Sequence, residues 1–219
     1  MSFEAIFWDN DGVLVDTEAV FIKACREVFA DEGIEISEGW FINESLAKGS
    51  SVFDLARKKG MSNEEIIQLR KRRNEYYSKV LMKHVPIVDG VKETLEALHG
   101  KFLMGVVTSS RKEHFEIMMK KTGFRRFFNF FITADDIKNT KPDPEPYLKA
   151  LEIAGKPCES CLVIEDSQRG VVAAKAAGLS CYAVPSELTK SLDFSMADKV
   201  LNSIRELPDI ILPTTSDFS

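Results

Sequence analysis

The sequence lacks long hydrophobic segments, and neither sign of charge strongly dominates it. No apolar run approaches the roughly 18 residues that would cross a lipid bilayer. The N-terminal residues, Met1-Ser2-Phe3-Glu4, do not form the positively charged start and apolar stretch of a signal peptide. The formal net charge is −5, so the chain has no overall basic field for nucleic acid or anionic membranes. We therefore expect a cytoplasmic protein, a monomer or weak dimer, that binds neither membrane nor nucleic acid.

Cysteine is scarce as well, with four residues: Cys25, Cys158, Cys161 and Cys181. They could form two disulfides, but nothing else in the sequence suggests secretion. Cys158 and Cys161 form a Cys-x-x-Cys pair, and the sequence lacks the second pair that a zinc site would need. A redox pair would open a helix after a strand, whereas this pair leads into a strand-like segment. We therefore expect Cys161 to be a core residue.

Short apolar runs and helical patterns alternate along most of the 219 residues. Hydrophobic residues make up 44% and charged residues 29%, which is ordinary for a globular protein. The predicted buried strands are residues 4–8, 102–107, 129–133, 161–164 and 181–184. The helical patterns between and after them are residues 90–98, 112–122, 144–154 and 170–177. This alternation predicts an α/β fold with a doubly wound (Rossmann-like) parallel sheet.

One segment, residues 17–83, interrupts the alternation because it has helical patterns and no convincing strand. Asp16 or Thr17 can cap its first helix. Ser62 and Glu65, three residues apart, have the spacing of a capping box and predict the start of a long helix. The predicted domains are a catalytic α/β core of residues 1–16 and 86–219 and an inserted helical cap of residues 17–85.

Polar residues follow several of the predicted strands, at the point where each strand ends. In a doubly wound sheet, ligands bind beyond the carboxyl ends of the strands, so these residues should converge on one crevice. Each group alone is typical of a solvated turn. Their shared position favours a common site. The residues are Asp9 and Asp11, then Thr108 and Ser109, then Lys141 in the loop after the third strand, and finally Glu165 and Asp166.

Several carboxylates in one small site repel each other, and a divalent cation relieves that repulsion. A set of oxygen ligands favours Mg²⁺, which usually retains waters and binds substrate phosphate. We expect Asp9 and Asp166 to supply side-chain ligands and Asp11 its backbone carbonyl. Glu165 would join the metal directly or through water.

A metal beside one lysine is suited to binding phosphate, with Lys141, the Thr108 hydroxyl and the Ser109 N–H as its partners. The nucleophile is either water or a carboxylate. Asp9 and Asp11 are two residues apart on an extended strand end, so their side chains point the same way. One can attack phosphorus to form an aspartyl-phosphate while the other transfers the proton.

Four segments together resemble the motifs of the haloacid dehalogenase superfamily, in the branch with a helical cap inserted after the first strand. The resemblance covers about residues 3–185, and the motifs occur in the family's order. The matching segments are residues 7–18 around Asp9-Asn10-Asp11-Gly12, Val106-Val107-Thr108-Ser109-Ser110, Lys141-Pro142-Asp143-Pro144 and Val163-Ile164-Glu165-Asp166-Ser167.

The resemblance implies Asp9 as nucleophile and Asp11 as general acid and base. It also implies Thr108 and Lys141 as phosphate ligands and Asp166 as a Mg²⁺ ligand. At Asn10 an apolar residue or cysteine is more common in the family. The contribution expected of Asn10 to phosphate binding is its backbone N–H, which the substitution leaves unchanged.

Three other reactions of the superfamily are alternatives to the hydrolysis of a phosphate ester. Dehalogenases and phosphonoacetaldehyde hydrolases lack the second aspartate, so Asp11 favours phosphoryl chemistry. β-Phosphoglucomutase is the main alternative, but this chain has Phe21 where the mutase has a cap histidine, and residues 48–53 contain no arginine. A phosphatase of small phosphorylated metabolites is therefore the first hypothesis. A mutase and a non-catalytic binding or regulatory relative are the alternatives.

Substrate choice is expected to depend on the cap, where Glu18, Lys48 and Ser50 are candidate contacts by analogy. A hexose or pentose phosphate is the first hypothesis, and nucleotide-like or glycolate phosphates are alternatives. The basic run of residues 70–73 is interpreted as a solvated helix face. The three histidines, His84, His99 and His114, are expected at the surface or at helix ends.

Overall fold

A six-stranded, fully parallel sheet forms the centre of the computed structural model, which describes residues 3–213. Its order is β3-β2-β1-β4-β5-β6, with β1 in the middle. The strands are β1 (Ala5–Trp8), β2 (Leu103–Val107), β3 (Phe130–Ile132), β4 (Cys161–Glu165), β5 (Ser180–Ala183) and β6 (Lys199–Val200). The predicted doubly wound α/β fold is thereby confirmed.

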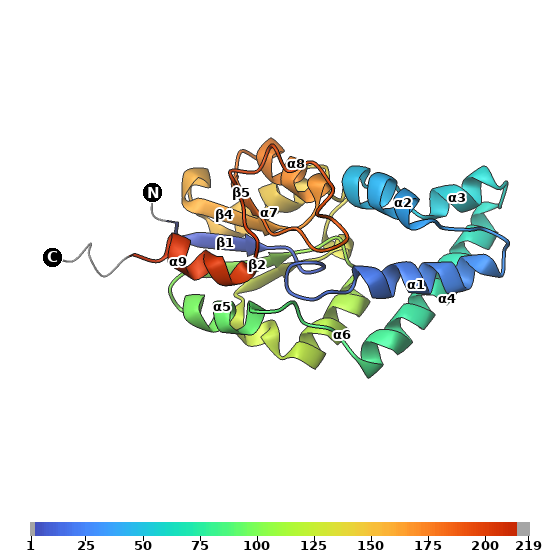
Figure 1. Ribbon diagram of the computed structural model, residues 1–219, viewed down its shortest axis with the longest axis horizontal. Helices are drawn as coiled ribbons and strands as arrows, with labels where there is room; N and C mark the ends of the chain where they lie inside the picture. Colours follow the sequence, from blue (N-terminus) through green and yellow to red (C-terminus); the bar gives the residue numbers. More distant parts are fainter. Residues whose placement is uncertain (1–2, 214–219) are drawn as a thin grey trace.

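Side chains of β1 alternate between two cores, one on each face of the sheet. Ile6 and Trp8 pack into one core, and Ala5 and Phe7 pack into the other, all with no exposed surface. Burial on both faces explains why this strand is an unbroken apolar run. Helices α5 (Val91–Leu98), α6 (Lys112–Thr122) and α9 (Leu207–Ile211) cover the first face, and α7 (Glu145–Ala154) and α8 (Gln168–Ala176) cover the second (Figure 1).

The segment between β1 and α5 contains helices and has a hydrophobic core of its own. The long helix α4 begins at the predicted capping box, in which Ser62 and Glu65 bond to each other's backbone N–H groups. This helical segment lies at one end of the molecule, beside the sheet (Figure 1). Its elements are α1 (Glu18–Ala30), α2 (Glu38–Trp40), the π-helix η1 (Phe41–Leu46), α3 (Phe53–Lys58) and α4 (Asn63–Lys83). We propose that residues 17–85 act as a cap domain on the α/β core.

The predicted elements match the structure to within a few residues, but several short elements were not predicted. Strand β6 has two residues, both exposed, so its sequence has no hydrophobic period to detect. The π-helix η1 and the short helix α9 were also not predicted. The sequence also predicts a polar, frayed tail over residues 213–219, of which residues 214–219 lie outside the described part of the chain.

All four cysteines are free, and Cys161 is fully buried in β4, as predicted. Among residues 3–213, no helix combines the length and hydrophobicity needed to cross a membrane.

Gly105 in β2 provides a test of the packing between neighbouring strands, because the Phe130 side chain of β3 lies directly over it. A Cβ at this position would lie 2.2 Å from the Phe130 ring of the neighbouring strand. We expect Gly105→Ala to lower the free energy of unfolding by about 1–3 kcal/mol, because the ring and backbone must shift. Urea denaturation measures this loss. As a control, Gly39→Ala places its Cβ where no heavy atom lies within 4 Å. Equal losses of stability in the two variants would contradict the packing argument.

Candidate active site

The candidate site lies where β1, β2 and β4 end, beneath the helical segment. The hydrogen bonding of the sheet continues one residue beyond two strands, since Asp9 N–H donates to the Ile164 carbonyl and Thr108 N–H to the Ile132 carbonyl, each at 2.9 Å. A cavity of about 400 Å³ opens above this edge. Its walls include Asp9, Asp11, Thr108, Ser109 and Lys141 from the core and Glu18, Phe21, Ser50, Arg70 and Arg73 from the helical segment.

Lys141 is buried among three oxygen acceptors. Its Nζ donates to Asp9 Oδ1 at 2.9 Å, to Glu165 Oε1 at 2.7 Å and to the Val107 carbonyl at 2.8 Å. Burial alone would lower the pKa of this amine, but the adjacent carboxylates of Asp9 and Glu165 raise it above its ordinary value. Lys141 therefore remains a cation at the edge of the cavity.

Glu165 is fully buried, and other residues already bond to both of its oxygens. Besides Lys141, Oε1 accepts from the Tyr147 hydroxyl at 2.7 Å. Oε2 accepts from Ser167 Oγ and from the Asp166 backbone N–H, each at 3.1 Å. Burial favours the neutral acid, yet Lys141 and these hydrogen bonds hold the pKa of Glu165 below its ordinary value. The geometry suits a group that positions Lys141.

Two residues that support Glu165 were not identified in the sequence. Tyr147, on α7, donates the hydroxyl, and Gly170, on α8, leaves space for the carboxylate. A Cβ at Gly170 would lie 2.0 Å from Glu165 Cδ. Each residue follows a predicted motif by three positions in the sequence, Tyr147 after residues 141–144 and Gly170 after residues 163–167. This closeness in sequence was the available signal that they support the site.

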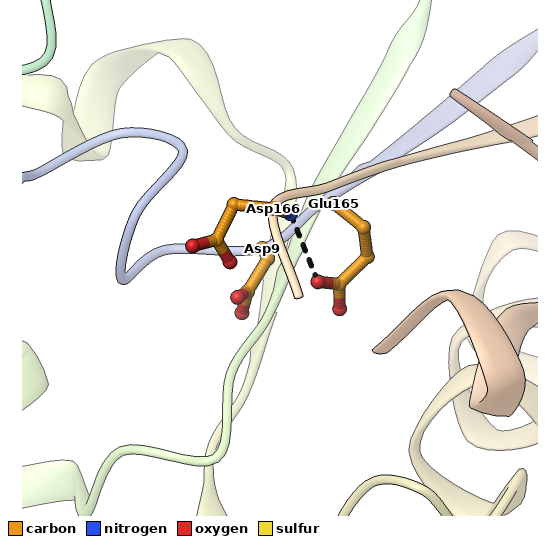
Figure 2. Close-up of side chains that lie close together, drawn as sticks. All are labelled: Asp9, Glu165 and Asp166. Carbon is orange, nitrogen blue, oxygen red and sulfur yellow. Dashed lines mark hydrogen bonds between the residues drawn. The ribbon is translucent and has the colours of Figure 1, made fainter. Parts of the chain in front are cut away.

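The carboxylates of Asp9, Glu165 and Asp166 supply oxygen atoms within 4.8 Å of one another. Figure 2 shows that Asp9 and Asp166 point into the same space, whereas Glu165 turns back toward the Asp166 backbone. Asp166 Oδ2 is buried without a hydrogen-bond partner in residues 3–213. Gly12, at a φ of +84°, makes room for it, because a Cβ there would lie 2.0 Å from this oxygen. The buried, unpartnered oxygen and its anionic neighbour fit a hard cation such as Mg²⁺.

The pKa values of the same carboxyl groups indicate electrostatic strain. Burial, with the charges of Glu165 and Asp11, raises the pKa of Asp9 to about 7 even though Lys141 opposes the shift. Burial and the charges of Asp9 and Glu165 also raise the pKa of Asp166 well above its ordinary value. A bound cation would favour the ionised forms of both groups.

Three hydroxyl groups surround the Asp11 carboxylate. Oδ1 accepts from Thr17 Oγ1 at 2.5 Å, and Oδ2 accepts from Ser110 Oγ at 2.7 Å and from Thr108 Oγ1 at 3.1 Å. Thr17 stands at the N-cap of α1, as predicted, but within the described chain its side chain forms no capping bond and instead holds Asp11. Thr108, predicted to bind phosphate, likewise contacts Asp11.

Of the three predicted cap contacts, Glu18 and Ser50 line the cavity and Lys48 does not. Glu18 is buried in the cavity wall, where burial and then the charge of Asp11 raise its pKa to about 8. It can therefore act as a neutral hydrogen-bond donor near pH 7. Lys48 is not among the residues that line the cavity, and its side chain is 64% exposed and pairs with Glu44 at 2.7 Å. The structure does not bring Lys48 to the site.

The interpretation of residues 70–73 as a solvated face was wrong for two of the four. Arg73 is only 7% exposed, and both Arg70 and Arg73 line the cavity. Lys71 and Arg72 do face solvent. The helical period explains the division, because residues 70 and 73 share the face of α4 that holds the buried residues Ile66 and Leu69.

His114 stands in the first turn of its helix, as expected of a helix-end residue, but it does not lie at the surface. This histidine on α6 is 3% exposed, its ring lies 4.8 Å from that of Tyr77 between centroids, and it lines the cavity. Burial, together with the charge of Arg73, lowers its pKa below the ordinary value. The packing of α6 against α4 buries it, and that contact cannot be deduced from the local sequence.

The family model for haloacid dehalogenase-like hydrolases matches residues 6–184, which include every motif described above. The chain belongs to this family. Among its relatives, it is 29% identical over 213 residues to protein CbbY of Rhodobacter capsulatus, covering 90% of this chain and 92% of that protein. It is 30% identical over 189 residues to the fructose-1-phosphate phosphatase YqaB of Escherichia coli, covering 83% and 96%.

A solved structure of the family has the same fold. CbbY from Rhodobacter sphaeroides, crystallised with xylulose-(1,5)bisphosphate, superposes with a TM-score of 0.82 at 25% identity, covering 94% of this chain and 96% of that one. The family assignment confirms the predicted hydrolase class and the superfamily resemblance.

The ion pairs of Lys141 generate a stability prediction. Lys141→Met leaves Glu165 and Asp9 buried without their cation, so the free energy of unfolding should fall by about 3–5 kcal/mol. Urea denaturation at pH 8 measures the loss. Lys156→Met is the matched control, since it breaks an exposed pair with Glu4 and should cost less than about 1 kcal/mol. Similar losses in the two variants would mean that the buried pairs are not the stabilising contacts.

Proposed function

We propose that the protein is a magnesium-dependent phosphatase that hydrolyses a small phosphorylated sugar through an aspartyl-phosphate on Asp9. The observation that carries this proposal is the position of Asp9, which contacts the buried Lys141 cation and lies with Asp11 in the wall of one cavity. Relatives in the family act on or bind phosphorylated sugars, as the name of YqaB and the ligand of CbbY state.

The first step is attack by the Asp9 carboxylate on phosphorus. Lys141 bonds to Oδ1, so Oδ2 is the oxygen that we assign to the attack. A bond forms between Asp9 and phosphorus while the bond from phosphorus to the sugar oxygen breaks. Asp11 gives its proton to the departing sugar oxygen. Lys141 and the backbone N–H groups of Asn10 and Ser109 are assigned to the phosphoryl oxygens.

The second step removes the phosphoryl group from Asp9. Asp11, now ionised, takes a proton from water, whose oxygen attacks phosphorus and displaces the Asp9 carboxylate as phosphate leaves. The hydroxyls of Thr17, Thr108 and Ser110 hold Asp11 in both protonation states, because a hydroxyl can donate or accept a hydrogen bond. The buried side chain of Asn10 donates from Nδ2 to Asp11 Oδ2 at 3.2 Å and to Met118 Sδ at 3.4 Å, so we assign it to holding Asp11 while its backbone N–H faces phosphate.

We assign Mg²⁺ to Asp9, Asp166 and the backbone carbonyl of Asp11. When bound, the cation supplies positive charge that offsets the carboxylates and the incoming phosphate. We place Glu165 in a supporting role, because Lys141, Tyr147, Ser167 and backbone N–H groups bond to both of its oxygens.

Two observations favour hydrolysis over the alternatives. The mutase has a cap histidine at the position of Phe21, whereas Phe21 offers an aromatic ring that packs against Phe41 and Tyr77. A non-catalytic relative would be free to lose its reactive groups, whereas Asp9, Asp11, Lys141 and Asp166 are all present.

Phosphate release from a panel of sugar phosphates, nucleotides and phosphoglycolate, with and without Mg²⁺, tests the proposed function. We expect magnesium-dependent release from one class of sugar phosphate. β-Glucose 1-phosphate belongs in the panel, because its conversion to glucose 6-phosphate with little release would establish the mutase alternative. Absence of turnover on every compound would contradict the phosphatase assignment.

Asp9→Asn should lower kcat by at least about 10³-fold, because an amide is a poor nucleophile. Asp135→Asn is the matched control, since Asp135 lies in the rim of the same cavity, where it pairs with Arg111 at 3.4 Å. We expect that control to retain activity within about threefold of the wild type. Substantial turnover by Asp9→Asn would remove Asp9 from the nucleophile role.

The raised pKa values of Asp9 and Asp166 predict that Mg²⁺ binds better at higher pH. Without metal, ionisation of Asp9 opposes burial, so its contribution to folding stability falls as pH rises from its ordinary value of 3.8 toward about 7. Mg²⁺ binds the ionised form and should therefore raise the Tm more at pH 8 than at pH 5.5. An equal rise at both pH values, or a larger one at pH 5.5, would contradict the assigned ligands.

A further inference from the structure

The end of the cavity formed by the helical segment contains two arginines, Arg70 and Arg73, that lack anionic partners. Neither forms a salt bridge with any carboxylate of residues 3–213. Arg73 is only 7% exposed, and its Nε–H has no hydrogen-bond acceptor in the described chain. Burying a cation without a counter-charge is costly, so the arrangement requires an explanation.

The groups around the two arginines do not neutralise them. The Arg73 guanidinium lies 4.6 Å from the ring centroid of Phe21 and 5.4 Å from that of Phe53, and Arg70 lies 4.4 Å from that of Phe53. The Cys25 thiol beside Arg73 has a pKa raised to about 11, chiefly by burial, and is therefore uncharged near pH 7. The aromatic rings orient the guanidinium groups but carry no negative charge.

Arg70 and Arg73 line the same cavity as Asp9 and Asp11, and residues of α1 and the N-cap before it contact both groups. Thr17 bonds to Asp11 at the core end of the cavity. Phe21, one turn further along α1, packs on Tyr77 with 5.5 Å between ring centroids. The Arg73 guanidinium lies over the ring of Phe21. A molecule whose phosphate sits at Asp9 can reach Arg73 by extending along Phe21. The cavity of about 400 Å³ is large enough for a sugar with a charged group at each end.

We propose that Arg73, together with Arg70, binds a second anionic group at the end of the substrate opposite to the phosphate that Asp9 attacks. The inference rests on the proposed phosphatase function and names its substrate class: a phosphorylated sugar that carries a second phosphate or a carboxylate. The planar guanidinium donates two parallel hydrogen bonds to either group, and the hydroxyls of Ser50 and Ser51 in the same wall can add further donors.

Matched pairs of substrates test this proposal. Fructose 1,6-bisphosphate is compared with fructose 1-phosphate, and 6-phosphogluconate with glucose 6-phosphate, so that one pair adds a phosphate and the other a carboxylate. The wild type should have a higher kcat/KM for at least one doubly anionic member. Arg73→Gln and Arg70→Gln should lower that preference about tenfold or more, mainly through KM, because each removes a charge-assisted contact. Arg73→Lys should retain part of it.

Arg72→Gln is the matched control, since Arg72 is the neighbouring arginine on α4 and pairs with Asp31 at 3.5 Å outside the cavity. It should leave the preference within about twofold of the wild type. Thermal unfolding of each variant verifies folding, and if Arg73→Gln does not fold, the half-buried Arg70→Gln decides the result. Equal losses on both members of a pair, or no preference in the wild type, would overturn the proposal and leave the arginines as cap packing. Failure to release phosphate from any compound would instead contradict the proposed function.

Discussion

The buried ammonium group of Lys141 lies between Asp9 and Glu165, and the rest of the site depends on these two ion pairs. Without the lysine, two carboxylates at the centre of the protein would have no neighbouring cation within the described chain. With it, Glu165 stays ionised and Asp9 is held at the wall of the cavity. Tyr147, Ser167 and Gly170 fix Glu165 in turn. A single cation thus sets the position of the proposed nucleophile and, in the proposed mechanism, supplies positive charge for phosphate.

The fold brings these groups together from distant parts of the chain. Central strand β1 delivers Asp9, its neighbour β4 delivers Glu165 and Asp166, and the loop after β3 delivers Lys141. Gly12 then allows the chain to pass Asp166 closely enough for its carboxylate to face that of Asp9. The remaining wall of the cavity comes from the helical segment, so the proposed reaction centre is built on the sheet and the proposed substrate-selecting surface is separate from it.

The sequence was sufficient for five of the six strands and for the polar groups at the edge of the sheet, because buried strands are short apolar runs and most of these groups follow them directly. It was insufficient wherever the helical segment meets the core. Arg73 and His114 looked like surface residues, since their burial results from contacts of α4 with α1 and α6. Lys48 looked like a substrate contact, but it pairs with Glu44 on the outside. Thr17 was recognised as a cap position, yet nothing local indicated that its hydroxyl would turn to Asp11.

The central claim is that Asp9 becomes phosphorylated during the reaction. The most direct measurement uses Asp11→Asn with Mg²⁺ and p-nitrophenyl phosphate, whose leaving group needs no proton, so that only the second step is slowed. After an acid quench, mass spectrometry of the peptides should find one phosphoryl group on Asp9, with a burst of nitrophenol equal to the enzyme concentration. A phosphoryl group on another residue, or steady release of nitrophenol and phosphate with Asp9 unmodified, would contradict the account.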